Sequence, residues 1–238
     1  MLKRLICIAR KLCCGAVSEA EQQEYIKQQL RKTSESFRKK TGRHIIKSKE
    51  KIYCAFALPK LVVSREEAQR DASMRLARFG IRPEDVTGKR ILDLGCNNGA
   101  MLFQLSNYSP SYCLGVEYDS EKVQIANKII DFNSLKAFDV REGDVDKLTV
   151  GELGGQFDIV LCLAIEAHVT DPDRLYRLLG DVTADVLYFE GNGGAKVDSV
   201  KAQLEAVGFH RIEYIGCCDD DIVESNNKRP LFVARKGN

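Results

Sequence analysis

The stretch Ile91-Leu92-Asp93-Leu94-Gly95-Cys96-Asn97-Asn98-Gly99 decides the fold of this chain. A short apolar strand ends in an acid and then in a glycine turn, which lets a ligand approach backbone that side chains would otherwise cover. The apolar run Tyr112–Val116 follows, and it ends in a second acid, Glu117. An acid at the tip of the second strand is placed to hold the two hydroxyls of a ribose. The two segments together predict a nucleoside-containing cofactor across the ends of a parallel sheet.

The spacing of the glycines separates one class of cofactor from another. A dinucleotide site uses G-x-G-x-x-G, whereas this chain has Gly95-x-Asn97-x-Gly99, with Met101 and Leu102 where a third glycine would fall. The segment Asp93–Gly99 resembles the first motif, D-x-G-x-x-x-G, of class I S-adenosylmethionine (SAM) methyltransferases.

Three later segments resemble the same family in order and spacing. Glu117–Asp119 is similar to its ribose acid, Gly143–Val145 to its adenine contact, and Phe157–Leu163 to its fourth strand. The resemblance implies SAM as the cofactor. The residues it implies as cofactor contacts within these motifs are Asp93, Gly95, Cys96, Asn97, Gly99, Glu117, Tyr118, Asp144, Val145 and Leu163.

Strands and helices alternate plainly after residue 80. We expect strands near 90–94, 112–117, 137–141, 157–163, 185–190, 210–217 and 230–235, and helices near 99–107, 120–130, 171–180 and 195–207. Such alternation predicts an α/β fold with a doubly wound, mostly parallel, seven-stranded sheet. No helix separates the last two strands, which therefore form a C-terminal antiparallel hairpin. We assign residues 61–238 to this Rossmann-like methyltransferase domain.

Composition is that of an ordinary globular protein, with 238 residues, 44% of them hydrophobic and 29% charged. The nine cysteines include no C-x-x-C pair, which argues against a zinc cluster and favours a reducing, cytoplasmic compartment. We expect no metal site, and we interpret Asp219–Asp221 as a solvated turn. No apolar run approaches the roughly 20 residues of a membrane span.

Residues 1–60 form a separate basic arm, with 15 Lys and Arg against 5 Asp and Glu, whereas the remainder is net acidic. Residues 1–15 have helical amphipathic spacing, which fits peripheral contact with the anionic inner face of a membrane or packing against protein. Ser18 and Glu21 have capping-box spacing, and the apolar pattern predicts a helix from Ser18 to about Lys40, ended by Gly42. The arm is therefore predicted to be largely helical.

Two further features of the arm and its junction bear on ligands. Arg38–Lys40 with Arg43 either bind phosphates or form a solvated basic face, and the lack of interleaved aromatic residues favours the second interpretation. Residues 51–56 are mixed in character and are expected to be irregular. Ser64 with Glu67 predicts a helix that runs to Phe79.

The upstream helix resembles one group of methyltransferases more narrowly. Ala68–Leu76, Asp181–Thr183, Glu190 and Arg229–Leu231 are similar to segments of bacterial O-antigen chain-terminating methyltransferases. This resemblance implies that two upstream residues, Tyr53 and Arg75, clasp the methionyl end of SAM. An arginine fork is matched to a carboxylate because it bonds both oxygens. Cys96-Asn97 and Glu166–His168 are also similar to segments of methyltransferases that modify the tRNA wobble uridine or the RNA cap phosphate.

Candidate catalytic residues follow the fourth and fifth strands, because ligands bind beyond the carboxyl ends of a doubly wound sheet. His168 has a suitable pKa for a general base and is similar to a histidine that ubiquinone-type O-methyltransferases carry before Asp-Pro, here Asp171-Pro172. Glu166 and Glu190 are the further catalytic candidates. A role for His168 in stabilising its loop is the alternative.

The expected function is methyl transfer from SAM to an oxygen, a hydroxyl or phosphate, of a glycan, a lipid-linked saccharide or another small molecule. RNA methylation is the second interpretation, favoured by the basic arm and opposed by the acidic remainder. A SAM-binding regulatory subunit without catalysis is the third. The sequence leaves the oligomeric state open.

Overall fold

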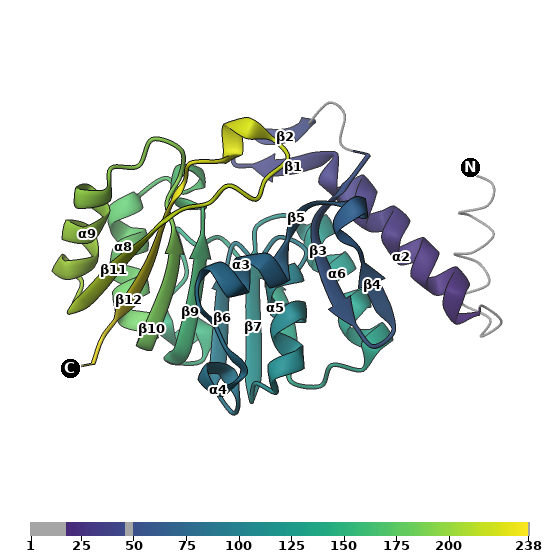
Figure 1. Cartoon of the computed structure of the whole chain (residues 1–238), viewed down its shortest axis with the longest axis horizontal. Coiled ribbons are helices and arrows are strands. Elements are labelled where there is room, and N and C mark those ends of the chain that lie inside the picture. Colours follow the sequence, from purple (N-terminus) through teal and green to yellow (C-terminus); the bar gives the residue numbers. More distant parts are fainter. Residues whose placement is uncertain (1–17, 46–49, 238) are drawn as a thin grey trace.

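A computed structural model describes residues 18–45 and 50–237, so the amphipathic segment 1–15 lies outside the described residues. Its centre is a seven-stranded sheet with the order β11-β12-β10-β9-β6-β7-β8 (Figure 1). The strands are β6 (Arg90–Leu94), β7 (Tyr112–Glu117), β8 (Phe138–Glu142), β9 (Phe157–Leu163), β10 (Thr183–Glu190), β11 (Arg211–Cys217) and β12 (Pro230–Arg235).

The direction of the strands confirms the fold expected from the sequence. β6 pairs in parallel with β7 and β9, β10 pairs in parallel with β9, and β8 pairs in parallel with β7. β12 runs antiparallel to both β10 and β11, as the C-terminal hairpin requires. The carboxyl ends of the parallel strands therefore meet along one edge of the sheet, and the order of connections reverses between β6 and β9.

Helices cover both faces of the sheet because successive strand residues point to opposite faces. Ile91 belongs to the apolar core shared with α3 (Ala72–Arg78), α5 (Ala100–Leu105) and α6 (Ser120–Asn133). Leu92 belongs to the second core, which it shares with α7 (Val150–Leu153), α8 (Pro172–Val182) and α9 (Val197–Ala206). The short α4 (Pro83–Val86) precedes β6.

The N-terminal segment is less helical than its apolar spacing predicted. Ser18 and Glu21 form the expected capping box, but α2 spans only Glu19–Ser34. The hydroxyls of Thr33 and Ser34 donate to the carbonyl of Leu30 and so compete with the helical backbone pattern at this end. The chain then forms the hairpin β1 (Ser36–Lys39) and β2 (Gly42–Ile45), in which Gly42 supplies a turn at φ 119°. The helix expected to reach Lys40 is thus replaced by two strands.

A small second sheet replaces two other sequence expectations. Residues 51–56, expected to be irregular, lie mostly in β3 (Ile52–Leu58), which pairs with β4 (Leu61–Val63) and β5 (Ala68–Asp71). The helix predicted to begin at Ser64 is divided into a 3-10 turn (Arg65–Glu67), β5 and α3. Burial of Ile52, Cys54 and Phe56 against the first core overrides the weak local pattern. Among residues 18–45 and 50–237, every helix is too short or too polar to cross a membrane.

Candidate active site

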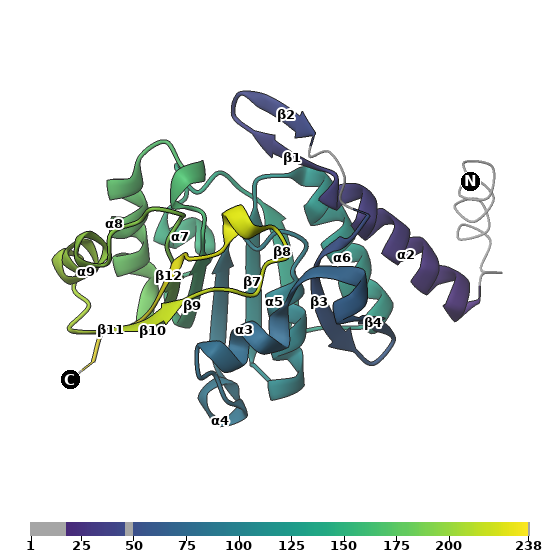
Figure 2. The same cartoon turned by 45° about the horizontal axis from the view of Figure 1, so that its top comes forward.

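A cavity of about 510 Å³ opens at the carboxyl ends of β6, β7 and β9, beneath the β1–β2 hairpin, which Figure 2 shows above this edge of the sheet. Its volume is within the range of small-molecule sites. The residues predicted from the sequence that line it are Tyr53, Gly95, Asn97, Glu117, Tyr118, Asp144, Val145, Leu163 and His168. Residues far apart in the sequence thus converge on one space.

The glycine turn after β6 has the backbone conformation that the motif predicts. Gly95 lies at φ 75° and Gly99 at φ 83°, and Asn97 between them also has a positive φ of 55°. A side chain at Gly95 would collide with Ile165, and one at Gly99 would reach within 2.8 Å of Phe103. Gly95 and Asn97 line the cavity, whereas Gly99 begins α5 behind it.

Glu117 is fixed at the tip of β7 by its backbone neighbours. Its carboxylate accepts the amide N–H of Asn97 at 2.9 Å and the amide N–H of Asp119 at 2.9 Å, one on each oxygen. Each carboxylate oxygen retains a second lone pair toward the cavity, which suits the paired hydroxyls of a ribose. Together with Tyr118, Asp144 and Val145 on the adjoining wall, this set of groups fits the adenosine part of SAM.

Asp93 lies at the end of β6 beneath this loop and is only 3% exposed. Its carboxylate has no hydrogen bond or ion pair to any residue that the structure describes. Burial raises the pKa of Asp93 to about 7, an effect that the charge of Arg75 opposes. A buried acid with a pKa near neutrality is poised to ionise when a cation comes close, as the ammonium group of SAM would if it reached this end of β6.

This raised pKa predicts a pH dependence of stability. The folded protein keeps the Asp93 proton up to about pH 7, whereas the unfolded chain releases it near pH 4. The free energy of unfolding should therefore fall as pH rises from 4 to 7, by about 4 kcal/mol from this residue. Urea unfolding of the wild type and of Asp93→Asn at pH 4.5 and pH 8 measures the effect. The variant should gain stability relative to the wild type at pH 8, and parallel curves would show that Asp93 is ionised in the fold.

The β1–β2 hairpin is attached to the walls of the cavity by ion pairs. Arg43 donates to both oxygens of Asp119, at 3.0 and 3.2 Å, and Lys40 pairs with Asp144 and Asp146. Phe37 of the hairpin lies edge-on to the His168 ring, with 6.4 Å between the ring centroids. Arg38–Lys40 and Arg43 were expected to contact phosphate or to form a solvated face, and most of them instead hold this hairpin in place.

The loop after β9 carries the candidate bases. Glu166–His168 form a 3-10 turn, and the Asn192 side chain supports it by accepting the N–H of Ala167 and donating to the carbonyl of Ala164. Ala164 adopts a positive φ of 60°, an uncommon conformation for a residue other than glycine. The turn places His168 on the cavity wall.

The two candidate bases have opposite surroundings. Burial, followed by the positive charges of Lys39, Arg229 and Lys122, lowers the pKa of His168, so its ring is neutral at pH 7. Burial raises the pKa of Glu166, which accepts a hydrogen bond from the Tyr176 hydroxyl at 3.2 Å. A neutral imidazole on the cavity wall is suited to accept a proton.

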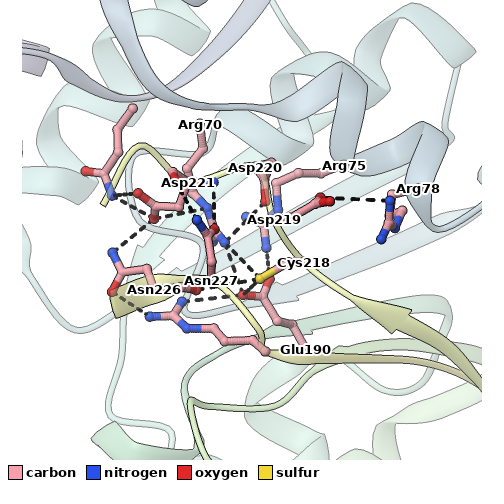
Figure 3. Close-up of polar contacts among 12 residues, drawn as sticks. Arg70, Arg75, Arg78, Glu190, Cys218, Asp219, Asp220, Asp221, Asn226 and Asn227 are labelled. Carbon is pink, nitrogen blue, oxygen red and sulfur yellow. Dashed lines mark hydrogen bonds and ion pairs between the residues drawn. The ribbon is translucent and has the colours of Figure 1, made fainter. Parts of the chain in front are cut away.

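Arg75 and Glu190 lie together in a buried ionic cluster instead of on the cavity wall (Figure 3). Glu190 is fully buried and pairs with Arg70, Arg75 and Arg229. Although burial opposes its ionisation, the charges of Arg75, Arg70 and Arg229 lower the pKa of Glu190. Neither residue lines the cavity, and their roles beside the methionyl carboxylate and the acceptor stay predictions.

The loop between β11 and β12 completes the ionic cluster. Asp221, expected in a solvated turn, is 5% exposed and accepts two hydrogen bonds from the Gln69 side chain, at 2.7 and 2.8 Å. Arg70 lies within 3.4 Å of Asp220 and 3.3 Å of Asp221, and its side chain is 1% exposed. Within residues 18–45 and 50–237, no three His, Cys, Asp or Glu side chains are grouped as metal ligands. No periodic pattern in the sequence indicates Arg70 as the centre of this cluster.

The chain matches a known family over more than half of its length. The sequence model described as "Methyltransferase domain" covers residues 85–213. The chain is 28% identical to the tRNA U34 carboxymethyltransferase of Campylobacter hominis over 119 residues, which are 45% of this chain and 39% of that protein. It is 27% identical to the ribosomal protein L11 methyltransferase of Thermotoga neapolitana over 132 residues, 53% of this chain and 46% of that protein. The matched part is less than half the length of either relative.

Solved structures share the fold at low sequence identity. The N-terminal domain of EvdMO1 with S-adenosylhomocysteine (SAH) bound has a TM-score of 0.59 and 21% identity, with 77% of this chain and 90% of that one covered. The magnesium protoporphyrin IX methyltransferase ChlM of Synechocystis PCC 6803, with bound SAM, has a TM-score of 0.55 and 16% identity, with coverage of 69% and 77%.

Proposed function

Because this chain belongs to the methyltransferase domain family, we propose that it moves the methyl group of SAM to an oxygen of a small-molecule or glycan acceptor held beside His168. SAM is the cofactor, and the residues around Glu117 fit its adenosine part. The observation that carries the proposal is the continuity of one cavity from Glu117 to His168. A cofactor bound to Glu117 and an acceptor beside His168 would therefore lie in the same cavity.

Methyl transfer requires that the acceptor oxygen be aligned with the methyl group and, for a hydroxyl acceptor, that its proton be removed. Bound SAM supplies a methyl group already activated on a sulfonium. The hairpin covers the cavity and limits the access of water to the reacting groups. If the acceptor is a hydroxyl, a ring nitrogen of His168 accepts its proton as the oxygen bonds to the methyl carbon and the carbon–sulfur bond breaks. A phosphate oxygen would need no base, and His168 would then only position it.

Glu117→Ala tests the cofactor site. Losing a charged hydrogen-bond partner costs about 1.5–3 kcal/mol, so the affinity for SAM and for SAH should fall by at least tenfold. The two amide donors that Glu117 now accepts would also lose their partner, which adds to the effect. Calorimetric titration of both ligands measures it, with Glu205→Ala on the exposed side of α9 as the control. Unchanged affinity in Glu117→Ala would remove this residue from the cofactor site.

RNA methylation is the second candidate, because the curated relatives include enzymes named for tRNA U34. The hairpin argues against an extended RNA surface, since Arg38 pairs with Glu142, and Arg43 and Lys40 also pair with carboxylates. Incubation with methyl-labelled SAM and separate glycan, lipid, small-molecule and RNA fractions distinguishes the candidates. Label in the RNA fraction alone would favour this second function. SAM binding without transfer to any fraction would favour a non-catalytic subunit.

A further inference from the structure

Lys122 is a buried cation inside the cavity. It lies in the first turn of α6, is 8% exposed, and contributes to the cavity lining. Its ammonium group has no hydrogen bond or ion pair with any other residue in the described part of the chain. A lysine ammonium that lines a cavity and has no carboxylate partner is available to an anionic ligand. Lys122 therefore points to a ligand that supplies the missing negative charge.

The other charges of the cavity leave this one uncompensated. Asp144 and Asp146 pair with Lys40 of the hairpin, and Glu117 accepts two backbone amides. Arg229, which also lines the cavity, pairs with Glu190. Among the described cations that line the cavity, Lys122 and Lys39 are thus the two without a carboxylate partner.

Lys39 approaches the same region from the hairpin above. It is exposed, lies 5.2 Å from the centre of the Phe37 ring, and has no carboxylate partner among the described residues. Lys39 of the hairpin and Lys122 of α6 both line the cavity that contains His168. Two lysines from different elements therefore face the same space as the candidate base.

We propose that Lys122 and Lys39 bind a phosphate group carried by the methyl acceptor. This inference rests on the proposed function and narrows its acceptor to phosphorylated compounds. Compact ammonium groups bind phosphate as point charges, whereas a planar carboxylate is matched by an arginine fork. The two arginines that line this cavity already have carboxylate partners, Glu142 for Arg38 and Glu190 for Arg229.

The test uses inorganic phosphate as the probe and the full chain saturated with SAH. Phosphate is titrated by calorimetry at constant ionic strength into the wild type, Lys122→Met, Lys39→Met and Lys128→Met. Lys128 lies on the same helix but is exposed and faces Tyr25. We expect phosphate affinity to fall about tenfold or more in Lys122→Met, to fall in Lys39→Met, and to stay unchanged in Lys128→Met.

A second measurement separates the phosphate from the carboxylate of the cofactor. SAH affinity should be the same in the wild type and in Lys122→Met. A loss of SAH affinity, with unchanged affinity for 5′-methylthioadenosine, would assign Lys122 to the methionyl carboxylate and overturn the phosphate site. Phosphate binding that is absent, or equal in all four proteins, would overturn it as well. Failure of the wild type to bind SAH would instead contradict the proposed function, so the two failures are distinguishable.

Discussion

His168→Asn should lower turnover by about 10²–10⁴-fold with a hydroxyl acceptor, while leaving the affinity for SAM unchanged. The histidine lies on the acceptor side of the cavity, across from Glu117, so its loss removes a proton acceptor without touching the adenosine site. Turnover is measured as label transfer from SAM to the acceptor that the fraction screen identifies. His210→Asn, at the start of β11, is the matched control and should be silent. Full turnover in His168→Asn would leave His168 only the loop-stabilising role.

The pH profile gives an independent reading of the same residue. A general base must be neutral, so kcat/KM should fall as pH falls through the pKa of His168. Burial and the charges of Lys39, Arg229 and Lys122 hold that pKa below 6.5, and the acidic limb should therefore lie below pH 6.5. Phe37, the nearest aromatic neighbour, carries no charge. Lys122→Met removes one of the three cations and should move the limb toward higher pH.

Glu190→Ala should destabilise the fold by about 3–5 kcal/mol, because it leaves Arg70 and Arg75 buried without their shared carboxylate. The change in the free energy of unfolding is measured by urea denaturation at pH 7. Glu205→Ala on α9 is the control and should change stability by less than about 0.5 kcal/mol. The pKa of Glu190 is lowered, so its stabilising effect is present at neutral pH and is lost as pH falls through the folded-state pKa. If the Glu190→Ala protein is as stable as the wild type but has no turnover, Glu190 has a catalytic role instead of a structural one.

The central sheet could be predicted because its signals are local and strong. β6 and β9 are mostly apolar runs, each interrupted by one aspartate, as expected for strands buried on both faces, and α6 and α7 between them have side-chain caps. The predicted positions of the seven strands agree with the structure within about two residues. The N-terminal strands could not be found this way. Strand β3 acquires its regularity from packing on α5 and from pairing with β4 and β5, which no local pattern encodes.

The candidate site was predictable where a motif coincides with a strand end. Glu117 ends β7 and His168 lies in the loop after β9, and the topology brings both to one edge of the sheet. Arg75 was predicted from a resemblance and Glu190 from its place at a strand end, and the two side chains form an ion pair across more than a hundred residues of sequence. No sequence pattern indicates a ligand-binding role for Lys122. The role is inferred from the lack of a carboxylate partner among the described residues, which only the folded structure reveals.

The ion pair between Arg43 and Asp119 joins the β1–β2 hairpin to the loop that follows Glu117. Asp119 accepts from Arg43, and its own amide donates to Glu117, so hairpin and ribose-binding acid share one chain of contacts. Coupling between two equilibria is reciprocal. If a ligand of Glu117 favours the seated position of the hairpin by some factor, seating of the hairpin raises the affinity for that ligand by the same factor. Cofactor affinity and the seating of the hairpin are therefore linked through Asp119, although the two lie on different elements of the fold.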